Sequence, residues 1–331
     1  MPETLIISEN EVRDCLNMGT AIKSAREAFR GVAEGKISIS RSVELGIRQY
    51  SGEVHVKSGY AENARVIGTK VAAGFYGNPK INLPSSIGVM LLFDISTGLP
   101  LAILDAGYLT DVRTGAAGAV AASVLARKNS KVVAIVGTGI QARMQVLALK
   151  EIYPIELLKV YGRNAQNRER YSSEMREKLD SVELQTFGTV EAAVLDADII
   201  VTATSSTTPL VRDEWIHDGV HINAIGADSK GKQELDPQIM KRAKIVVDNR
   251  EQCVSVGEIQ HAISNKIIDE AKIHAEVGEI LLGMKKGREN DAEITLFDST
   301  GISALDIVTA NEVFKLVKAR GLGKSAKLLN A

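Results

Sequence analysis

Hydrophobic and polar positions follow two different patterns along the chain. In residues 21–32 apolar side chains recur at the spacing of a helix, and Gly35 follows as a stop signal. Between residues 38 and 104 the apolar runs are short and are separated by Gly, Pro and Asn, which predicts an antiparallel-rich sheet. The strands predicted in the first 104 residues are residues 5–7, which precede the helix, and residues 43–47, 53–56, 65–72, 86–93 and 101–104.

Beyond a small-residue helix at 114–127 and a polar break at 128–130, predicted strands alternate with predicted helices. This order favours a parallel, doubly wound sheet and therefore an α/β fold. We expect two domains, residues 1–127 with 302–331 and residues 128–301, because the last helix is expected to return to the first domain. The predicted strands are residues 132–136, 158–161, 199–202, 221–225, 245–247 and 294–297, and the helices are residues 141–151, 164–178 and 303–320.

Composition is that of an ordinary globular protein. The chain has 331 residues, 45% of them apolar and 24% charged, with a net charge of -1. This length exceeds one typical domain of about 100–200 residues. The near-neutral balance gives no overall electrostatic attraction to nucleic acid or to an anionic membrane, so neither is an expected partner.

Cysteine use and hydropathy point to the cytoplasm. Cys15 and Cys253 lie far apart and fit neither a disulfide framework nor a CxxC metal pair, and the histidines show no paired spacing for a metal site. The amino terminus lacks the basic region of a signal peptide. The longest weakly polar stretch, residues 115–126, is far below the ~20 residues of a membrane span.

The strongest local signal is a buried strand that runs into a GxGxxA turn at the start of a helix. Gly137 permits the tight turn, Gly139 lets the backbone approach a pyrophosphate, and Ala142 keeps helix and strand close. The helix amino terminus attracts the anion. The alternative is a glycine-rich turn with a purely structural role. The cofactor-binding residues predicted here are Gly137, Thr138, Gly139, Ile140 and Gln141.

The end of the second strand of this unit indicates which dinucleotide binds. An acidic residue there would accept hydrogen bonds from the NAD ribose, but the chain has Gly162, Arg163 and Asn164 instead. Arg163 is suited to a 2′-phosphate and Asn164 adds a donor, so NADP(H) is favoured and NAD(H) is the alternative. In the competing interpretation, Arg163 stacks on adenine or points to solvent.

Several motifs, in order along the chain, resemble the ornithine cyclodeaminase/mu-crystallin family. They are GEVHVKSGY at 52–60, TKV at 69–71, LPSS at 83–86, LDAGYLTDVRTGAAG at 104–118, GTGIQA at 137–142 and HINAIGAD at 221–228. The resemblance implies a Rossmann-type doubly wound parallel sheet plus an α+β domain for substrate binding and dimerisation. It also implies a homodimer.

The resemblance further implies the roles of individual residues. Lys70 and Arg113 match the groups that hold the substrate carboxylate, and Arg41 matches a further cation. Asp228 matches the proton-transfer residue, whose pKa partial burial would raise. On the cofactor side the matching residues are Ser85, Thr110, Arg113, Lys232 and Ser299. Thr202 and Ala203 end a Rossmann-type strand and are expected to face the dinucleotide.

His55 and Lys57 depart from the commoner family pattern. They are two apart on one strand and therefore share a face. This version resembles the branch that contains iminosuccinate reductase and ectoine-utilisation proteins, so both are candidate substrate-binding residues, and Lys57, like Lys70, is a candidate for catalysis. The alternative is a solvated surface strand. Glu234 and Asp236 are interpreted as helix-capping acids.

Members of this family carry out several reactions, so fold alone does not decide the activity. The leading hypothesis is NAD(P)H-dependent reduction of an imine of a small 2-oxo acid, such as Δ1-pyrroline-2-carboxylate, iminosuccinate or the imine of pyruvate, to the amino acid. The alternatives are an ornithine cyclodeaminase and an NADPH-dependent small-ligand-binding protein of the mu-crystallin type.

Overall fold

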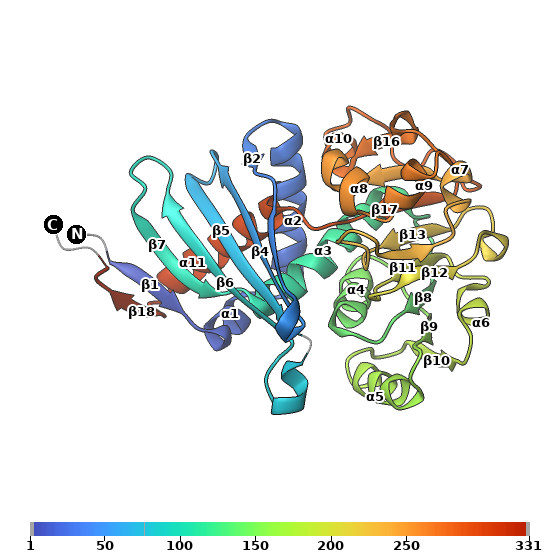
Figure 1. The fold of residues 1–331 in the computed structure, drawn as a ribbon, viewed down its shortest axis with the longest axis horizontal. Helices are drawn as coiled ribbons and strands as arrows, with labels where there is room; N and C mark the ends of the chain where they lie inside the picture. Colours follow the sequence, from blue (N-terminus) through green and yellow to red (C-terminus); the bar gives the residue numbers. More distant parts are fainter. Residues whose placement is uncertain (1–2, 76, 329–331) are drawn as a thin grey trace. The chain divides into compact units, whose positions relative to one another are not determined.

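The computed structural model describes residues 3–75 and 77–328 of the chain (Figure 1). It divides into two compact units, residues 1–113 with 302–331 and residues 114–301. The sequence analysis placed the boundary after residue 127, whereas the units separate inside helix α3 (Gly107–Leu125). The outer ends of the predicted first domain, residues 1–2 and 329–331, lie outside the described residues.

The first unit is built on one mixed sheet with the strand order β18-β1-β7-β6-β5-β4-β2, and β3 pairs with β4. All pairs from β2 to β7 are antiparallel, as predicted, while β1 is parallel to β7. The strands are β1 (Thr4–Ile7), β2 (Ile37–Ile39), β3 (Val43–Ile47), β4 (Gly52–Ala61), β5 (Val66–Phe75), β6 (Ser86–Asp94), β7 (Pro100–Asp105) and β18 (Lys324–Ala326).

Helices α1 (Glu9–Cys15), α2 (Met18–Ala33) and α11 (Ser303–Ala319) belong to the same unit. The α11 helix packs on β4 and β5 and beside α2, although nearly the whole chain separates it from them (Figure 1). Glycine makes this packing close, because a Cβ atom on Gly68 would lie 2.6 Å from Ile307 Cγ1. The first turn of α11 is thereby held against the middle of the sheet.

The second unit is built on a fully parallel sheet with the order β10-β9-β8-β11-β13-β17-β15-β16. This confirms the predicted doubly wound sheet. Its strands are β8 (Val132–Val136), β9 (Leu157–Tyr161), β10 (Glu183–Phe187), β11 (Ile199–Thr202), β13 (His221–Ala224), β15 (Lys244–Val247), β16 (Ile273–Glu276) and β17 (Thr295–Asp298). A small separate pair joins β12 (Thr207–Val211) to β14 (Gln233–Leu235).

The helices of this unit connect its strands. They are α4 (Ile140–Lys150), α5 (Ala165–Arg176), α6 (Val190–Val194), α7 (Ile239–Arg242), α8 (Arg250–Val256), α9 (Gln260–Ser264) and α10 (Val277–Leu281). The helices from α6 to α10 are short, and only a helix start near α7 was expected from the sequence, through the interpretation of Glu234 and Asp236 as capping acids.

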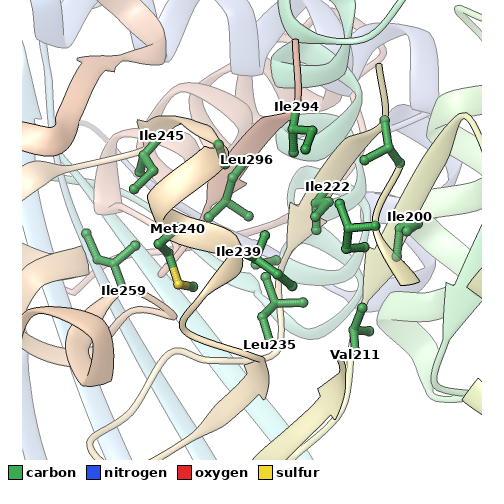
Figure 2. Packing of buried hydrophobic residues seen from close by; sticks show 14 of the residues in the cluster. Ile200, Val211, Ile222, Leu235, Ile239, Met240, Ile245, Ile259, Ile294 and Leu296 are labelled. Carbon is green, nitrogen blue, oxygen red and sulfur yellow. The ribbon is translucent and has the colours of Figure 1, made fainter. Parts of the chain in front are cut away.

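One row of branched side chains fixes the centre of the parallel sheet. Ile200, Ile222, Leu296 and Ile245 are paired in register across β11, β13, β17 and β15, and each is fully buried. Figure 2 shows this row with Ile239 and other side chains gathered around it. Such packing makes the sheet a rigid support for the loops at the carboxyl ends of its strands.

Within residues 3–75 and 77–328, no helix has both the length and the apolar character needed to cross a bilayer.

Candidate functional site

The turn after β8 requires glycine for two separate reasons. Gly137 has a φ of 127°, which side chains rarely adopt, and a Cβ atom there would lie 2.4 Å from the carbonyl oxygen of Ala203. Gly139 is the N-cap residue of α4, whose first backbone N–H groups point beyond the strand end. The turn therefore lies close to the end of β11. The amino terminus of α4 beside it can bind an anionic ligand.

A pocket of about 390 Å³ opens at this turn. Of the predicted cofactor residues it contains Gly137, Thr138, Gly139, Arg163, Asn164 and Ala203. Ile140 and Gln141 do not line it, and Thr202 is fully buried at the end of β11. The other lining residues are Tyr161, Gly162, Asn167, Thr204, Ser205, Ser206 and Leu210.

Arg143, which the sequence analysis did not single out, holds the glycine turn in place. Its guanidinium donates hydrogen bonds to the carbonyl oxygens of Thr138 and Gly139 at 2.6 and 3.0 Å. The same group pairs with Glu174 at 2.6 Å and lies 4.9 Å from the ring centre of Tyr171. A side chain on α4 thus tightens the turn that precedes its own helix.

The end of β9 supplies no acid to the pocket, all of whose lining residues belong to the fully described segment 114–301. Arg163 is exposed at its edge. Asn164 caps α5, because its side chain accepts a hydrogen bond from the Asn167 backbone at 2.9 Å. Arg163 therefore follows β9 in the sequence at the place where an NAD-specific site has an acidic residue.

The first unit contains a buried cluster of charges. Lys70 on β5 donates a hydrogen bond to Asp306 Oδ1 at 2.8 Å, and Arg113 Nε forms an ion pair with the same oxygen at 2.8 Å. Lys70, Arg113 and Asp306 are only 2%, 4% and 1% exposed. Asp306 was missed by the sequence analysis, although an acid within the apolar run 302–308 is an unusual feature.

Burial and neighbouring charges shift the pKa values in this cluster. Burial, together with the Arg113 guanidinium, lowers the pKa of Lys70 to about 7. Burial alone would raise the pKa of Asp306, but Arg113 and Lys70 outweigh it, and the pKa lies below its usual value. Lys57 stands opposite Lys70 in the strand register. Lys70 and Arg113 share the Asp306 carboxylate, which leaves positive charge for a substrate anion.

Two residues that the resemblance assigned to the cofactor lie in this cluster. The hydroxyl of Thr110 accepts a hydrogen bond from Lys70 Nζ at 3.2 Å, and Arg113 pairs with Asp306. Ser85 is exposed in the loop before β6, where its carbonyl oxygen accepts a hydrogen bond from the Phe75 backbone at 2.8 Å. Arg41 is exposed just after β2.

His55 and Lys57 share one face of β4 with Glu53. His55 Nε2 lies 3.6 Å from Glu53 Oε1, and Glu44 pairs opposite His55 in the strand register. The potential ligand atoms of Glu44, Glu53 and His55 lie within 4.8 Å of one another. Glu44 is exposed, and exposed acidic groups commonly gather without an ion, so the grouping alone does not indicate a metal site.

Asp228 and Lys232 form an ion pair at 2.5 Å in the segment after β13. The Asp228 side chain is 49% exposed, so this carboxylate is less buried than expected. Ser299, predicted near the nicotinamide, is 4% exposed and donates its hydroxyl to Asp248 at 3.0 Å.

The interpretation of Glu234 as a helix-capping acid is wrong. Glu234 lies in β14, is fully buried, and accepts hydrogen bonds from the backbone N–H groups of Thr204 and Gly226. Asp236 does not cap the helix either: its side chain accepts a hydrogen bond from the Gln238 backbone at 2.9 Å in the turn before α7, whose N-cap residue is Gln238. The two acids, although close in sequence, have different roles.

Comparison with known families gives one match over almost the whole chain. The model of the ornithine cyclodeaminase/mu-crystallin family matches residues 2–321.

Similar solved structures agree over the full length. An archaeal alanine dehydrogenase dimer with bound NAD superposes with a TM-score of 0.94 at 39% identity, covering 99% of this chain and 100% of that one. Thermococcus litoralis Δ1-pyrroline-2-carboxylate reductase, in complex with NADH and L-proline, gives 0.94 at 35% identity over 98% and 100%. The iminosuccinate reductase of Paracoccus denitrificans, in complex with NAD+, gives 0.91 at 31% identity over 99% and 100%.

Proposed function

Because the chain belongs to the ornithine cyclodeaminase/mu-crystallin family, we propose that it is an oxidoreductase that reduces the imine of a small 2-oxo acid to the amino acid. The reverse reaction is the dehydrogenation of an amino acid. The observation that carries this proposal is the buried pair of cations, Lys70 and Arg113, which share one carboxylate and so retain positive charge. The relatives that act on alanine, pyrroline-2-carboxylate and iminosuccinate all handle substrates with a carboxylate beside the reacting carbon.

The proposed role of Lys70 and Arg113 is to orient the substrate. Arg113 offers a planar fork that matches a carboxylate, and Lys70 adds a point charge. Because Asp306 already fixes both side chains, little conformational freedom is lost when the substrate binds. The imine carbon attached to this carboxylate is thereby held in one position.

The dinucleotide pocket fits the other reactant. A Cβ atom on Gly137 would collide with Ala203, so the turn is glycine-specific at this position. This turn and the amino terminus of α4 suit a pyrophosphate. When bound, the dinucleotide supplies the hydride. The proton of the substrate nitrogen is transferred by one of two residues. One is Asp228, which pairs with Lys232, and the other is Lys57, which lies opposite Lys70 in the strand register.

NADP(H) is the proposed cofactor, with NAD(H) as the alternative. Arg163 is exposed at the pocket edge, and the pocket lining of segment 114–301 contains no Asp or Glu that would repel a 2′-phosphate. The three similar structures contain NAD or NADH, so a preference for NADPH would distinguish this chain from them.

A homodimer is proposed from the uncovered face of the first sheet. Val43, Val56, Val71 and Val89 are paired in register across β3, β4, β5 and β6. Val43, Val71 and Val89 are 55%, 37% and 42% exposed. A continuous apolar row of this kind is the usual surface of a subunit contact. The archaeal alanine dehydrogenase is a dimer.

The proposed location is the cytoplasm. Cys15 and Cys253 are free and buried, which fits a reducing compartment.

A substrate panel tests the proposed function. Purified protein is mixed with NADPH or NADH and with cyclic imines, or with 2-oxo acids plus ammonia or methylamine, and cofactor oxidation is followed by absorbance. Oxidation that depends on one imine supports the proposal. Conversion of ornithine to proline without net cofactor change would identify a cyclodeaminase instead, and tight NADPH binding without any turnover would favour a ligand-binding protein.

A further inference from the structure

Several buried carboxylates form a chain of contacts beneath the carboxyl edge of the parallel sheet. Glu234, Glu258 and Asp298 are 0% exposed, and Asp248 is 2% exposed. Each accepts hydrogen bonds from backbone N–H groups, and two of them bind the backbone of the next acid along: Asp298 accepts from Glu258, and Glu258 from Glu234. No Lys, Arg or His of segment 114–301, which is described throughout, forms an ion pair with them.

Glu234 ends this chain of contacts and joins two loops. Its Oε1 accepts a hydrogen bond from the Thr204 backbone at 2.6 Å, and its Oε2 accepts one from the Gly226 backbone at 2.9 Å. Thr204 follows β11 and Gly226 follows β13, which are neighbouring strands. One carboxylate therefore satisfies a backbone donor from each loop.

Both loops belong to the functional region of this unit. Thr204 lines the dinucleotide pocket, and Gly226 lies two residues before Asp228. The two loops are in close contact, because a Cβ atom on Gly226 would lie 2.3 Å from the Thr204 carbonyl oxygen. A small displacement of either loop would move both the pocket wall and the segment that carries Asp228.

We propose that Glu234 is a positioning residue, whose ionised carboxylate clamps the loop that lines the dinucleotide pocket to the loop that carries Asp228. The inference rests on the proposed function, because Glu234 would support the proposed dinucleotide site. Glu234 acts through the backbone of these two loops, with further interactions from the Thr202 and Thr204 side chains, and is not one of the reacting groups.

The geometry distinguishes Glu234 from its neighbour Glu258. Each Glu234 oxygen accepts from a different N–H group, so an amide NH₂ in place of either oxygen would face a backbone donor. In Glu258, Oε1 accepts from both Glu234 and Leu235, at 2.9 and 2.7 Å, whereas Oε2 has only a longer 3.1 Å contact to the same Glu234 N–H. Glu258 Oε2 is therefore the oxygen of the pair that is best placed to carry a proton.

Electrostatics agree with this distribution. Burial raises the pKa of Glu234, and hydrogen bonds from Thr204 and Gly226 offset part of the rise. Burial raises the pKa of Glu258 well above its usual value, and the Glu234 carboxylate raises it further. Both pKa values are raised, and the larger rise is that of Glu258, so Glu258 is the acid of the pair that takes up a proton first.

Three variants test the inference. In Glu234→Gln, the new amide NH₂ faces a backbone N–H group. In Glu258→Gln, the amide NH₂ can replace Glu258 Oε2, the oxygen best placed to carry a proton. Asp198→Asn is the matched control, because Asp198 accepts hydrogen bonds from the Lys131 and Val132 backbones at 2.7 and 2.9 Å at the opposite, amino end of β8. The measurements are the Kd of NADPH from its fluorescence, kcat with the active imine, and the Tm.

For Glu234→Gln we expect a Kd at least about tenfold higher and a lower kcat, while Glu258→Gln stays within about threefold of wild type. Asp198→Asn is expected to lower the Tm without changing the Kd. Equal NADPH affinity in wild type and Glu234→Gln would overturn the inference and leave the proposed function intact. Failure of the wild-type chain to bind any dinucleotide would contradict the proposed function itself and this inference with it.

If Glu234→Gln does not fold, the wild-type chain provides the test. Amide protons bonded to an ionised carboxylate resonate at low field and exchange slowly, so both properties are expected for the Thr204 and Gly226 amides in NMR spectra. Fast exchange of either amide in the dinucleotide-bound protein would overturn the clamp.

Discussion

Asp306 Oδ1 accepts a hydrogen bond from Lys70 Nζ at 2.8 Å, and the two side chains are 1% and 2% exposed. The residues are 236 positions apart in sequence and come from α11 and β5. Burying an isolated charge is costly, so the carboxylate and the ammonium stabilise each other. Arg113 approaches the same oxygen, and the cluster therefore retains positive charge for a substrate carboxylate.

Removing either cation should weaken the use of substrate. A charge-assisted hydrogen bond contributes about 1.5–3 kcal/mol, so Lys70→Ala and Arg113→Ala are expected to lower kcat/KM by about 10- to 100-fold or more. Steady-state kinetics with the active imine measure this effect. The matched control is Lys36→Ala, because Lys36 pairs with Glu34 at 2.7 Å but its side chain is 55% exposed. Wild-type kinetics in both active-site variants would exclude the carboxylate clamp.

Carboxylate binding should depend on pH through Lys70. The Lys70 pKa of about 7 means that the ammonium loses its proton as the pH rises through this value, so affinity for a carboxylate should fall above it. The inhibition constant of a competing carboxylate that has no other titrating group in this range measures the effect between pH 5.5 and about 9. An inhibition constant that does not change with pH would contradict the assignment.

Asp306→Asn should move this pH dependence in a defined direction. The Asp306 charge raises the pKa of Lys70, so its removal lowers that pKa further and shifts the loss of affinity to lower pH. The same inhibition measurement checks the shift, and circular dichroism establishes whether the variant is folded. A folded Asp306→Asn variant with the wild-type profile would show that Asp306 does not act on Lys70.

Arg163 should determine the cofactor preference. Arg163→Ala is expected to raise the KM for NADPH about tenfold and to leave that for NADH within about twofold, since only NADPH has the 2′-phosphate. Arg170→Ala, on the helix α5 that follows Arg163, is the control, because the Arg170 side chain is 71% exposed and lies 3.8 Å from Glu174. An unchanged ratio of the two KM values in Arg163→Ala would remove the basis for the NADP(H) proposal.

The apolar face of the first sheet should mediate dimerisation. Val71→Asp places a charge in the middle of the row from Val43 to Val89, and we expect it to convert a dimer to a monomer. Leu195→Asp makes the same change at a residue of the second unit that is 39% exposed. Sedimentation velocity distinguishes the two species. A dimeric Val71→Asp protein, or a monomeric wild type, would contradict the proposed interface.

The regular elements were predictable because their patterns are local. The apolar run 132–136 and the glycine turn after it identified β8 and the dinucleotide pocket, and Ile199–Thr202 was predicted with its observed limits. The short strand β14 was missed, because three residues are too few to display a period. Helix α1 was also missed, since its seven residues bury only Val12 and Cys15.

The supporting charges of the site were not predictable from local pattern. Asp306, Arg143 and Glu234 obtain their roles from partners that are distant in sequence or from buried backbone groups. The acid within the apolar run 302–308 is an unusual local feature, but it does not identify its partners, and a helix-start Glu has an ordinary local explanation that only the tertiary contacts contradict. Thr110, which the family resemblance assigned to the cofactor, also accepts a hydrogen bond from Lys70 at 3.2 Å, a contact that no local pattern indicates.

In the proposed reaction, a hydride passes from the dinucleotide to the carbon that bears the substrate carboxylate. The most direct measurement uses NADPH deuterated at the transferring C4 position with the active imine, followed by mass spectrometry of the amino acid product. One deuterium at the α-carbon, in amounts equal to the cofactor oxidised, is the predicted result. Product that contains no deuterium, or product formed without net cofactor oxidation, would contradict this hydride transfer.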